Sequence, residues 1–369
     1  MIQSVKNIVC AAVLAAACVP ASAQIVMNVE QCVADALANN ARMKNAANDI
    51  KASEEAKKSA STKYFPMLSA SASSYIADKG LLEMEMGPDM KMSMLKDGIV
   101  GGISAQMPLY AGGRIINANR LAETGLEASR LQHSLARNEV ALTAETYFWQ
   151  VVTIKEKLKT LAAVERQLSE FGNDAQAAVD AGVSDRNDLL QVNLKANTVK
   201  SQRISLESTL ATARLRLAQY TGHSGDSVDV SADMDYTMPP SPLQLYVEPA
   251  SALASTPEYG LLQQNVKAAK LEYKLTLGQN LPTVAVGGGY MYDNLMDKSH
   301  TFWIGFATVS VPISGWWGGS HEMKRSKLAV SNAENKLTDN AQLLTVGMED
   351  KWNRMTDAYR QIGIALESI

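Results

Sequence analysis

Apolar and polar positions recur with two different periods in this chain, and each period has its own regions. Four segments of about ten residues alternate with a period of two, which is typical of β-strands: residues 67–77, 99–109, 283–292 and 302–311. A strand of this length can cross a bilayer when it is tilted. The same length also fits ordinary core strands with aromatic ends, so periodicity alone leaves both interpretations open.

A helical period dominates the rest of the chain. Residues 114–177 contain no proline. Apolar residues recur there every 3, 4 or 7 positions in two runs, from Leu131 to Trp149 and from Ile154 to Leu168, which predicts about 95 Å of helix. A return helix repeats in steps of 3 or 4 at Leu189, Val192, Ala196, Val199, Arg203, Leu206, Leu210, Ala213 and Leu217. This is the seam of a coiled coil, with Arg203 as its one polar member. An antiparallel pair in a soluble bundle is the alternative, but the strands just before Arg114 argue against it.

The turn of this hairpin is predicted around Gly182. A glycine can adopt the left-handed conformation that ends the first helix, and Ser184 or Asp185 can cap the next one. The sequence therefore predicts a helical hairpin over residues 114–220.

The order of a helical segment, two strands and a further long helical segment occurs twice in the chain. Ala36-Leu37-Ala38 matches Ala252-Leu253-Ala254, and Pro66 matches Pro282, at the same offset of 216 residues. We expect a first repeat over 24–222, a connector over 223–250 with a Pro-rich centre near Pro240, and a second repeat over 251–369. The second repeat lacks a counterpart of about 164–220, so we expect either a fragment or a C-terminally truncated protein.

Residues 1–23 have the pattern of a signal peptide. Lys6 precedes an apolar stretch over 8–19, and Ala21-Ser22-Ala23 provides a small-x-small cleavage site. A lipoprotein signal at Cys18 is a weaker alternative, because Ala15 stands where Leu or Val is preferred. Cleavage leaves Cys32 alone, so no internal disulfide is expected.

Composition excludes several classes of function. The 35 Lys and Arg nearly balance the 38 Asp and Glu, so the basic excess of a nucleic-acid-binding protein is absent. The four histidines are scattered, and Arg325 stands where a zinc motif starting at His321 needs its second histidine. We therefore expect no catalytic residues, no metal and no cofactor. Methionines at 84, 86, 90, 92 and 94 could bind Cu(I), although a loop that packs on neighbouring subunits is the simpler interpretation.

Aromatic residues lie near both ends of the predicted strands, as in the interfacial girdles of an outer-membrane barrel. The expected membrane-interface set is Tyr64, Phe65, Tyr75, Tyr110, Tyr290, Tyr292, Trp303, Trp316 and Trp317. Four strands cannot close a barrel, and open edges cannot face lipid. The strands therefore imply an oligomer whose chains share one wall.

The whole set of features resembles the TolC family of outer-membrane efflux channels. The resemblance rests on Phe65-Pro66, on the run from Pro108 to Arg114 with its Gly112-Gly113 pair, and on the tip from Gly182 to Leu190. It implies a mixed α/β membrane protein: a homotrimer with a 12-stranded outer-membrane β-barrel, four strands per chain, continuous with a coiled-coil periplasmic tunnel. It also implies a Gram-negative outer-membrane location, a periplasmic adaptor (membrane fusion protein), and an inner-membrane pump that supplies the energy for a passive duct.

The resemblance also suggests roles for the tip. We expect Gly182, Val183, Ser184, Asp188 and Leu189 to contact the adaptor. Asp174, Asp180 and Asp185, repeated three times in a trimer, could form a ring of negative potential in the pore, although solvated helix-end charges explain them equally well.

Two other classes of protein are alternatives to an efflux channel. A periplasmic coiled-coil scaffold or adhesin would share the helical repeats but would not need paired ten-residue strands. A secreted hydrolase would need a nucleophile, a base and an orienting group, which the sequence does not bring together.

Overall fold

The structure is a computed structural model that describes residues 25–78, 82–85, 91–94, 97–233, 237–295, 298–313 and 315–368. The expected signal peptide lies outside the described residues. Contacts divide the chain into two compact units, one made of residues up to Ala46 with Leu135–Thr237, and one of Ala47–Ser134 with Met238–Ile369. Each unit combines segments from distant parts of the sequence, so the two units do not correspond to the two predicted repeats. The repeats therefore stay a prediction.

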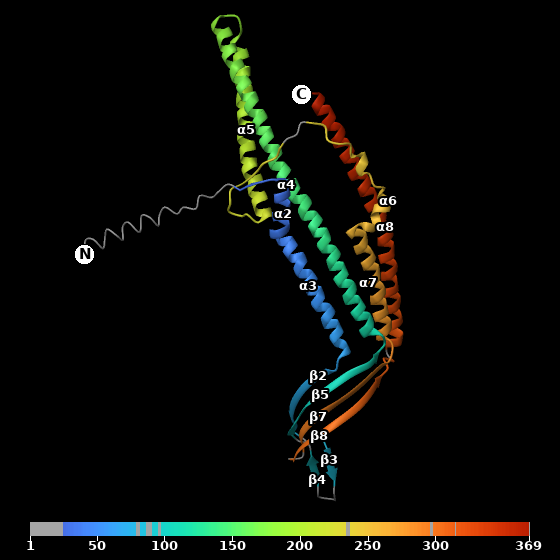
Figure 1. The fold of residues 1–369 in the computed structure, drawn as a ribbon. Helices are drawn as coiled ribbons and strands as arrows, with labels where there is room; N and C mark the ends of the chain where they lie inside the picture. Colours follow the sequence, from blue (N-terminus) through green and yellow to red (C-terminus); the bar gives the residue numbers. More distant parts are fainter. Residues whose placement is uncertain are drawn as a thin grey trace, which may run out of the picture. The chain divides into compact units, whose positions relative to one another are not determined.

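The first unit is dominated by a helical hairpin. It consists of the later part of α4 (Arg114–Asp180) and α5 (Arg186–Thr221), joined at the tip in the upper part of Figure 1. The predicted long hairpin is therefore present, and α5 ends at Gly222, which has a φ of 86°.

A small core joins the base of this hairpin to α2 (Val29–Asn39) and to the first residues of α3 (Ala41–Ser61). Asn28 caps α2 and forms a reciprocal capping box with Gln31. Cys32 is fully buried in the core, and its thiol is the free cysteine of the described chain. Burial, together with the carboxylates of Asp35 and Glu145, raises the pKa of this thiol to about 11. The thiol therefore stays protonated.

Two short strands, which the sequence pattern does not predict, complete the first unit. β1 (Ile25–Met27) pairs in parallel with β6 (Val228–Val230), which lies inside the expected connector. Three apolar-polar-apolar residues carry too little periodicity to be recognised alone. The pairing closes one side of the core because Met27, Val228 and Val230 are buried.

The second unit contains a four-stranded antiparallel sheet in the order β2 (Met67–Ile76), β5 (Asp97–Ala111), β7 (Thr283–Leu295) and β8 (Lys298–Ser310). All four predicted strands are present. α3, α4, α7 (Pro257–Gln279) and α8 (Gly315–Glu367) leave the sheet from one end (Figure 1). Short helical segments η1 (Thr62–Tyr64), η2 (Pro242–Leu245), α6 (Pro249–Ala252) and η3 (Leu253–Ser255) make connections.

Several boundaries differ from the prediction. β5 is 15 residues long and includes Pro108, which lies at a register shift before Tyr110. A proline has no N–H to donate, so a bulge is where a strand tolerates it.

The sequence predicts the segment between β2 and β5 to be a loop, and this prediction is wrong in part. The segment contains a hairpin of β3 (Leu82–Glu85) and β4 (Lys91–Met94). Apolar and polar residues alternate along both strands of this hairpin, which is the period of a strand. Met84 pairs with Met92, and Leu82 pairs with Met94. Met86 and Met90 lie outside the described residues.

Candidate functional site

One face of the four-stranded sheet is apolar, and we call it the apolar face. Residues that oppose each other on neighbouring strands point to the same side. Ile103 opposes Ala70 and Tyr290, and Tyr290 opposes Trp303. The register extends this face to Leu68, Ala72, Ser74, Ile76, Ile99, Gly101, Ala105, Met107, Tyr110, Val284, Val286, Gly288, Tyr292, Thr301, Gly305, Ala307 and Val309. At the end of the sheet away from the helices, the same face also carries the polar residues Asp97, Asn294 and Ser299.

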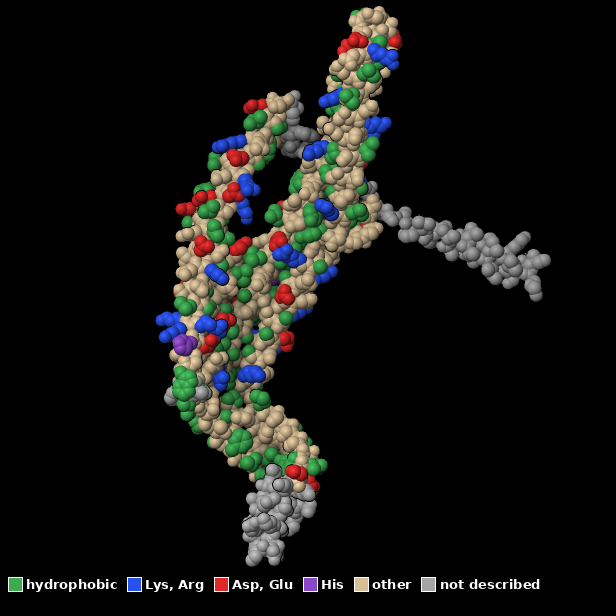
Figure 2. Space-filling model, turned by 180° about the vertical axis from the view of Figure 1, so that it is seen from behind, with side chains coloured by type: hydrophobic (Ala, Val, Ile, Leu, Met, Phe, Trp, Pro, Cys, Tyr) green, Lys and Arg blue, Asp and Glu red, His purple; other side chains and the backbone are tan. Residues whose placement is uncertain are grey.

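The large side chains of the apolar face are exposed in the single chain. Leu68 is 74% exposed and Trp303 is 80% exposed, at opposite edges of the sheet. In Figure 2, blue and red charged side chains gather over the helices, whereas the sheet shows mainly green and tan surface. A continuous exposed apolar surface of this kind indicates contact with lipid or protein.

The opposite face, which we call the polar face, is lined mainly by small and hydroxyl-bearing residues on β2 and β5. Ser69 and Ser104 share a hydrogen bond of 3.0 Å between their hydroxyl oxygens. Larger side chains there lie over glycines: a Cβ on Gly102 would come within 2.6 Å of the Met291 sulfur. On β8 this face carries Phe302, Ile304 and Phe306, so it is polar on β2 and β5 and apolar on β8. The contrast between the two sides is strongest on β2 and β5, where it fits a wall between lipid and water.

The predicted interface aromatics of the strands divide between the two faces. The Tyr290 and Trp303 rings lie 5.0 Å apart on the apolar face. Tyr110 and Tyr292 share that face, whereas Tyr75 opposes Gly98 and lies on the polar face.

The other predicted interface aromatics lie at the helical end of the sheet. Tyr64 ends η1 and is followed by Phe65, and both are exposed. Trp316 and Trp317 lie in the first turn of α8, where Trp317 is exposed. Their role at a membrane interface stays a prediction.

Two glycines meet at the junction between sheet and helices. Gly112 has a φ of 62°, which favours glycine, and it follows the last residue of β5. Its backbone lies against Gly278 in the last turn of α7, where a Cβ would come within 2.5 Å of the Gly112 carbonyl oxygen. The absence of both side chains therefore lets α4 and α7 approach each other as they leave the sheet.

The hairpin tip has the geometry that the sequence predicts. Gly182 has a φ of 69°, its N–H donates to the Val179 carbonyl, and the Val183 N–H donates to the Ala178 carbonyl. These two bonds form a Schellman motif, which ends a helix by satisfying its last carbonyls. Asp185 is the residue that caps α5, because its side chain accepts from the Asn187 N–H.

The predicted adaptor-contact residues form a compact surface at this tip. Val183 is 83% exposed and Leu189 is half-buried. The Ser184 hydroxyl donates to the Asp188 carboxylate at 2.8 Å, which ties the turn to the first turn of α5. The tip therefore offers a fixed backbone with an exposed apolar side chain.

The three predicted pore acids are all exposed near the tip. Asp180 accepts a hydrogen bond of 2.8 Å from Gln176, and Asp185 is engaged as the cap of α5. Capping explains Asp185 without a pore. The assignment of Asp174, Asp180 and Asp185 to a pore stays a prediction.

The polar member of the seam is paired across the hairpin. Arg203 of α5 donates to Glu165 of α4 at 3.0 Å and to Glu207 of its own helix at 3.0 Å. The charged group therefore fixes the register of α4 against α5 without an unpaired charge.

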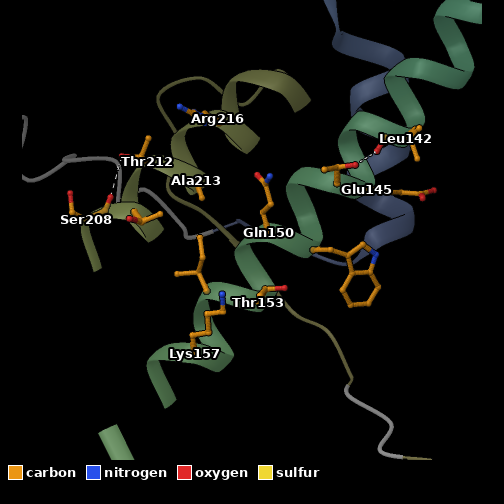
Figure 3. A pocket seen from close by; sticks show the side chains of 13 residues that line it. Leu142, Glu145, Gln150, Thr153, Lys157, Ser208, Thr212, Ala213 and Arg216 are labelled. Atoms are coloured by element: carbon orange, nitrogen blue, oxygen red, sulfur yellow. Dashed lines mark hydrogen bonds between the residues drawn. The ribbon is translucent and has the colours of Figure 1, made fainter. Parts of the chain in front are cut away.

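An open groove of about 870 Å³ lies between α4 and α5 nearer the base of the hairpin. Figure 3 shows its lining from both helices, with Glu145, Gln150 and Lys157 from α4 and Thr212 and Arg216 from α5. Its mixed polar lining differs from the mostly apolar lining of small-molecule sites. The groove is a helical surface and does not bring together a nucleophile, a base and an orienting group.

A charged cluster at the base of the hairpin ties three elements together. Asp229 of β6 accepts from Lys155 of α4 at 3.2 Å and forms an ion pair of 2.8 Å with Arg214 of α5. Burial alone would raise the pKa of Asp229, but the Val230 N–H and the two cations hold it below its usual value. The carboxylate is therefore ionised whenever the unit is folded near neutral pH.

We predict that Asp229→Asn destabilises the first unit by about 1–3 kcal/mol at pH 7, because two cations lose their partner. The folded-state pKa is lowered, so this contribution is present above the unfolded pKa near 3.8 and disappears as the pH falls through the folded value. Denaturant unfolding at pH 7 and at pH 3 measures the difference. The exposed Asp233→Asn is the control, and an equal loss for both variants would contradict the prediction.

Within the ranges that the structure describes, no three His, Cys, Asp or Glu side chains cluster as metal ligands do. In those same ranges, no helix has an apolar stretch long enough to span a bilayer.

Comparison with known proteins identifies the family. The profile of the outer membrane efflux protein family matches residues 32–223, which is more than half of the chain. The chain belongs to this family. It is a protein of the Gram-negative outer membrane with a periplasmic extension, in a family of efflux ducts and not of enzymes.

Solved structures of membrane channels share the fold of this outer membrane efflux protein. The outer-membrane channel OprN superposes with a TM-score of 0.71 at 16% identity, over 92% of this chain and 75% of OprN. CusC gives 0.69 at 15% identity, over 93% and 81%. The CmeC outer membrane channel of Campylobacter jejuni gives 0.70 at 15% identity, over 92% and 71%. A search of curated sequences finds no significant match.

Proposed function

We propose that this outer membrane efflux protein is one subunit of a trimeric exit duct. Four strands from each of three chains would form a 12-stranded barrel, and the helices would form a tunnel through the periplasm. The observation that carries the proposal is the apolar face, which spans all four strands and leaves large side chains exposed. Such a face is stable where lipid covers it.

The edges of the sheet support an oligomer. Among the described strands, β2 and β8 each pair on one side only. β2 runs away from the helices and β8 runs back toward them, so β8 of one copy can pair with β2 of the next in antiparallel fashion. Closure removes every open edge, which a bilayer requires because no water is there to satisfy the free N–H and C=O groups.

The duct would work within a tripartite efflux or type I secretion system. A periplasmic adaptor would dock at the tip on Gly182, Val183, Ser184, Asp188 and Leu189, and an inner-membrane pump would drive small molecules or proteins through a passive channel. Asp174, Asp180 and Asp185 would place negative charge around the periplasmic entrance and favour cations. Each chain would contain two repeats, over 24–222 and 251–369, that supply two strands each.

Two variants of neighbouring residues test the lipid-facing assignment. Ile103→Lys would place a charge on the apolar face near the middle of β5, which costs about 2–4 kcal/mol at the bilayer midplane. Ser104→Lys adds the same side chain on the polar face, where water can solvate it. We expect Ile103→Lys to lose heat-resistant oligomers from the outer-membrane fraction, while Ser104→Lys retains them.

The same fractionation separates the proposal from a periplasmic scaffold. Equal assembly of the two lysine variants would reject a lipid-facing apolar face. A soluble monomer of the wild-type chain would favour the scaffold or adhesin.

A further inference from the structure

A basic groove lies between α4 and α7 in the second unit, separate from the sheet faces and the tip. Its volume is about 600 Å³, and its lining is Arg120, Glu123, Gln263, Val266, Lys267, Lys270, Leu271 and Lys274. We propose that this groove binds a phosphate-bearing anion, such as the headgroup of a phospholipid.

The charges of the groove are unbalanced. The four cations of the lining face one carboxylate, Glu123, which already accepts from Lys57 of α3 at 3.0 Å. Lys270 is paired with Glu334 of α8 at 2.8 Å. Among the described residues, no carboxylate forms a salt bridge with Arg120, Lys267 or Lys274. The charge of Lys267 adds to that of Lys57 in lowering the pKa of Glu123.

The spacing of these cations concentrates their field. Lys267, Lys270 and Lys274 follow each other at three and four residues, so they lie along one face of α7, and Arg120 adds a guanidinium from α4. Like charges at this spacing disfavour the helix, and a bound anion removes that repulsion. Lysine serves as a point charge for phosphate, and arginine adds a planar fork of donors.

The remaining lining suits an amphiphile. Val266 and Leu271 are buried and form an apolar floor beside the cations. A phospholipid combines a phosphate with hydrocarbon, so both parts of the lining would be used. Inorganic phosphate would use the cations alone.

The position of the groove fits the inner surface of the outer membrane, and this step rests on the proposed function. Lys274 lies five residues before the end of α7, and Arg120 lies six residues after the start of α4, about 8–9 Å along each helix. The headgroup layer of a bilayer is about 5–8 Å thick on each side. With the sheet in the membrane, this end of the groove reaches the phosphates of the periplasmic leaflet.

Titration of the purified full-length protein in neutral detergent tests the site. The probes are dihexanoyl phosphatidic acid, dihexanoylglycerol as its phosphate-free analogue, and inorganic phosphate. We expect the phosphatidic acid to bind, and K267Q/K274Q to weaken binding by at least about tenfold, because two charge-assisted contacts are lost. Arg120→Gln, on the other helix, should weaken it as well.

The matched control is K324Q/K327Q, which removes two exposed lysines from one face of α8 and should leave binding unchanged. Binding of phosphatidic acid alone identifies the source as lipid, and equal binding of inorganic phosphate identifies a free anion. Binding that is absent, that the groove variants leave unchanged, or that dihexanoylglycerol reproduces would overturn the proposal. Membrane fractionation of the same preparations reports separately on the proposed function.

Discussion

Gly112→Ala is expected to destabilise the junction between sheet and helices by about 2–5 kcal/mol, enough to deplete the assembled protein. Two effects add. A φ of 62° is strained for alanine, and the new Cβ would overlap the backbone of Gly278. Neither backbone segment can move aside easily. β5 is held in the sheet by β2 and β7, and α7 continues almost directly into β7.

Two further glycines turn this prediction into a graded series. Gly113 has a φ of 74°, but the atom nearest to a Cβ added there would be the Asn117 side-chain nitrogen, at 3.6 Å. Gly113→Ala should therefore cost only the backbone strain of about 1–2 kcal/mol. Gly125 is helical with open space around it, so Gly125→Ala should be neutral or stabilising by about 1 kcal/mol. Denaturant unfolding and the yield of heat-resistant oligomers give the order. Equal effects at Gly112 and Gly113 would show that backbone overlap does not matter.

Replacing Gly182 and Leu189 together with arginine should abolish export while leaving oligomers assembled. A Cβ at Gly182 would meet no atom of the described chain within 4 Å, so the added bulk meets only solvent or a partner. The strain at Gly182 is about 1–2 kcal/mol and is confined to a turn that the long hairpin can tolerate. Drug or dye efflux from cells, compared with cells that lack the protein, measures the loss.

Two controls separate partner contact from tip distortion. Gly182→Asn tolerates the left-handed conformation but still adds a side chain at the proposed contact, so it should leave oligomers assembled and reduce export less than the double arginine variant. Leu194→Arg adds a charge at an exposed position of α5 beyond the proposed contact and should retain export. Unchanged export in the double variant would reject the adaptor assignment.

Local chemistry explains why the tip could be predicted from sequence. A Schellman turn needs a residue with positive φ and a following helix needs a cap, and Gly182 and Asp185 satisfy these needs within four positions. The seam of α5 was predicted for the same reason, since its period belongs to one helix. The partner of Arg203, Glu165, lies 38 residues away and appears only when the helices pack.

Long-range pairing explains what sequence reasoning missed. β1 and β6 lie about 200 residues apart in sequence, and each gains its strand conformation from the other. The basic groove also draws on residues that are far apart, with Arg120 and Lys274 brought together by the order of strands in the sheet. The lysine spacing on α7 was a visible signal, but its neighbour on α4 was not.

The sequence by itself determined the four strands, the long hairpin and its tip, because these depend on periodicity and on the conformational preferences of single residues. The sequence of a single strand did not distinguish its apolar face from its polar face, since glycine and alanine occur on both. Only the tertiary structure decided that Ile103, Tyr290 and Trp303 share one face and that Tyr75 lies on the other. The physical reason is that a sheet has one register for all its strands, so weak preferences in four segments add up to one apolar surface.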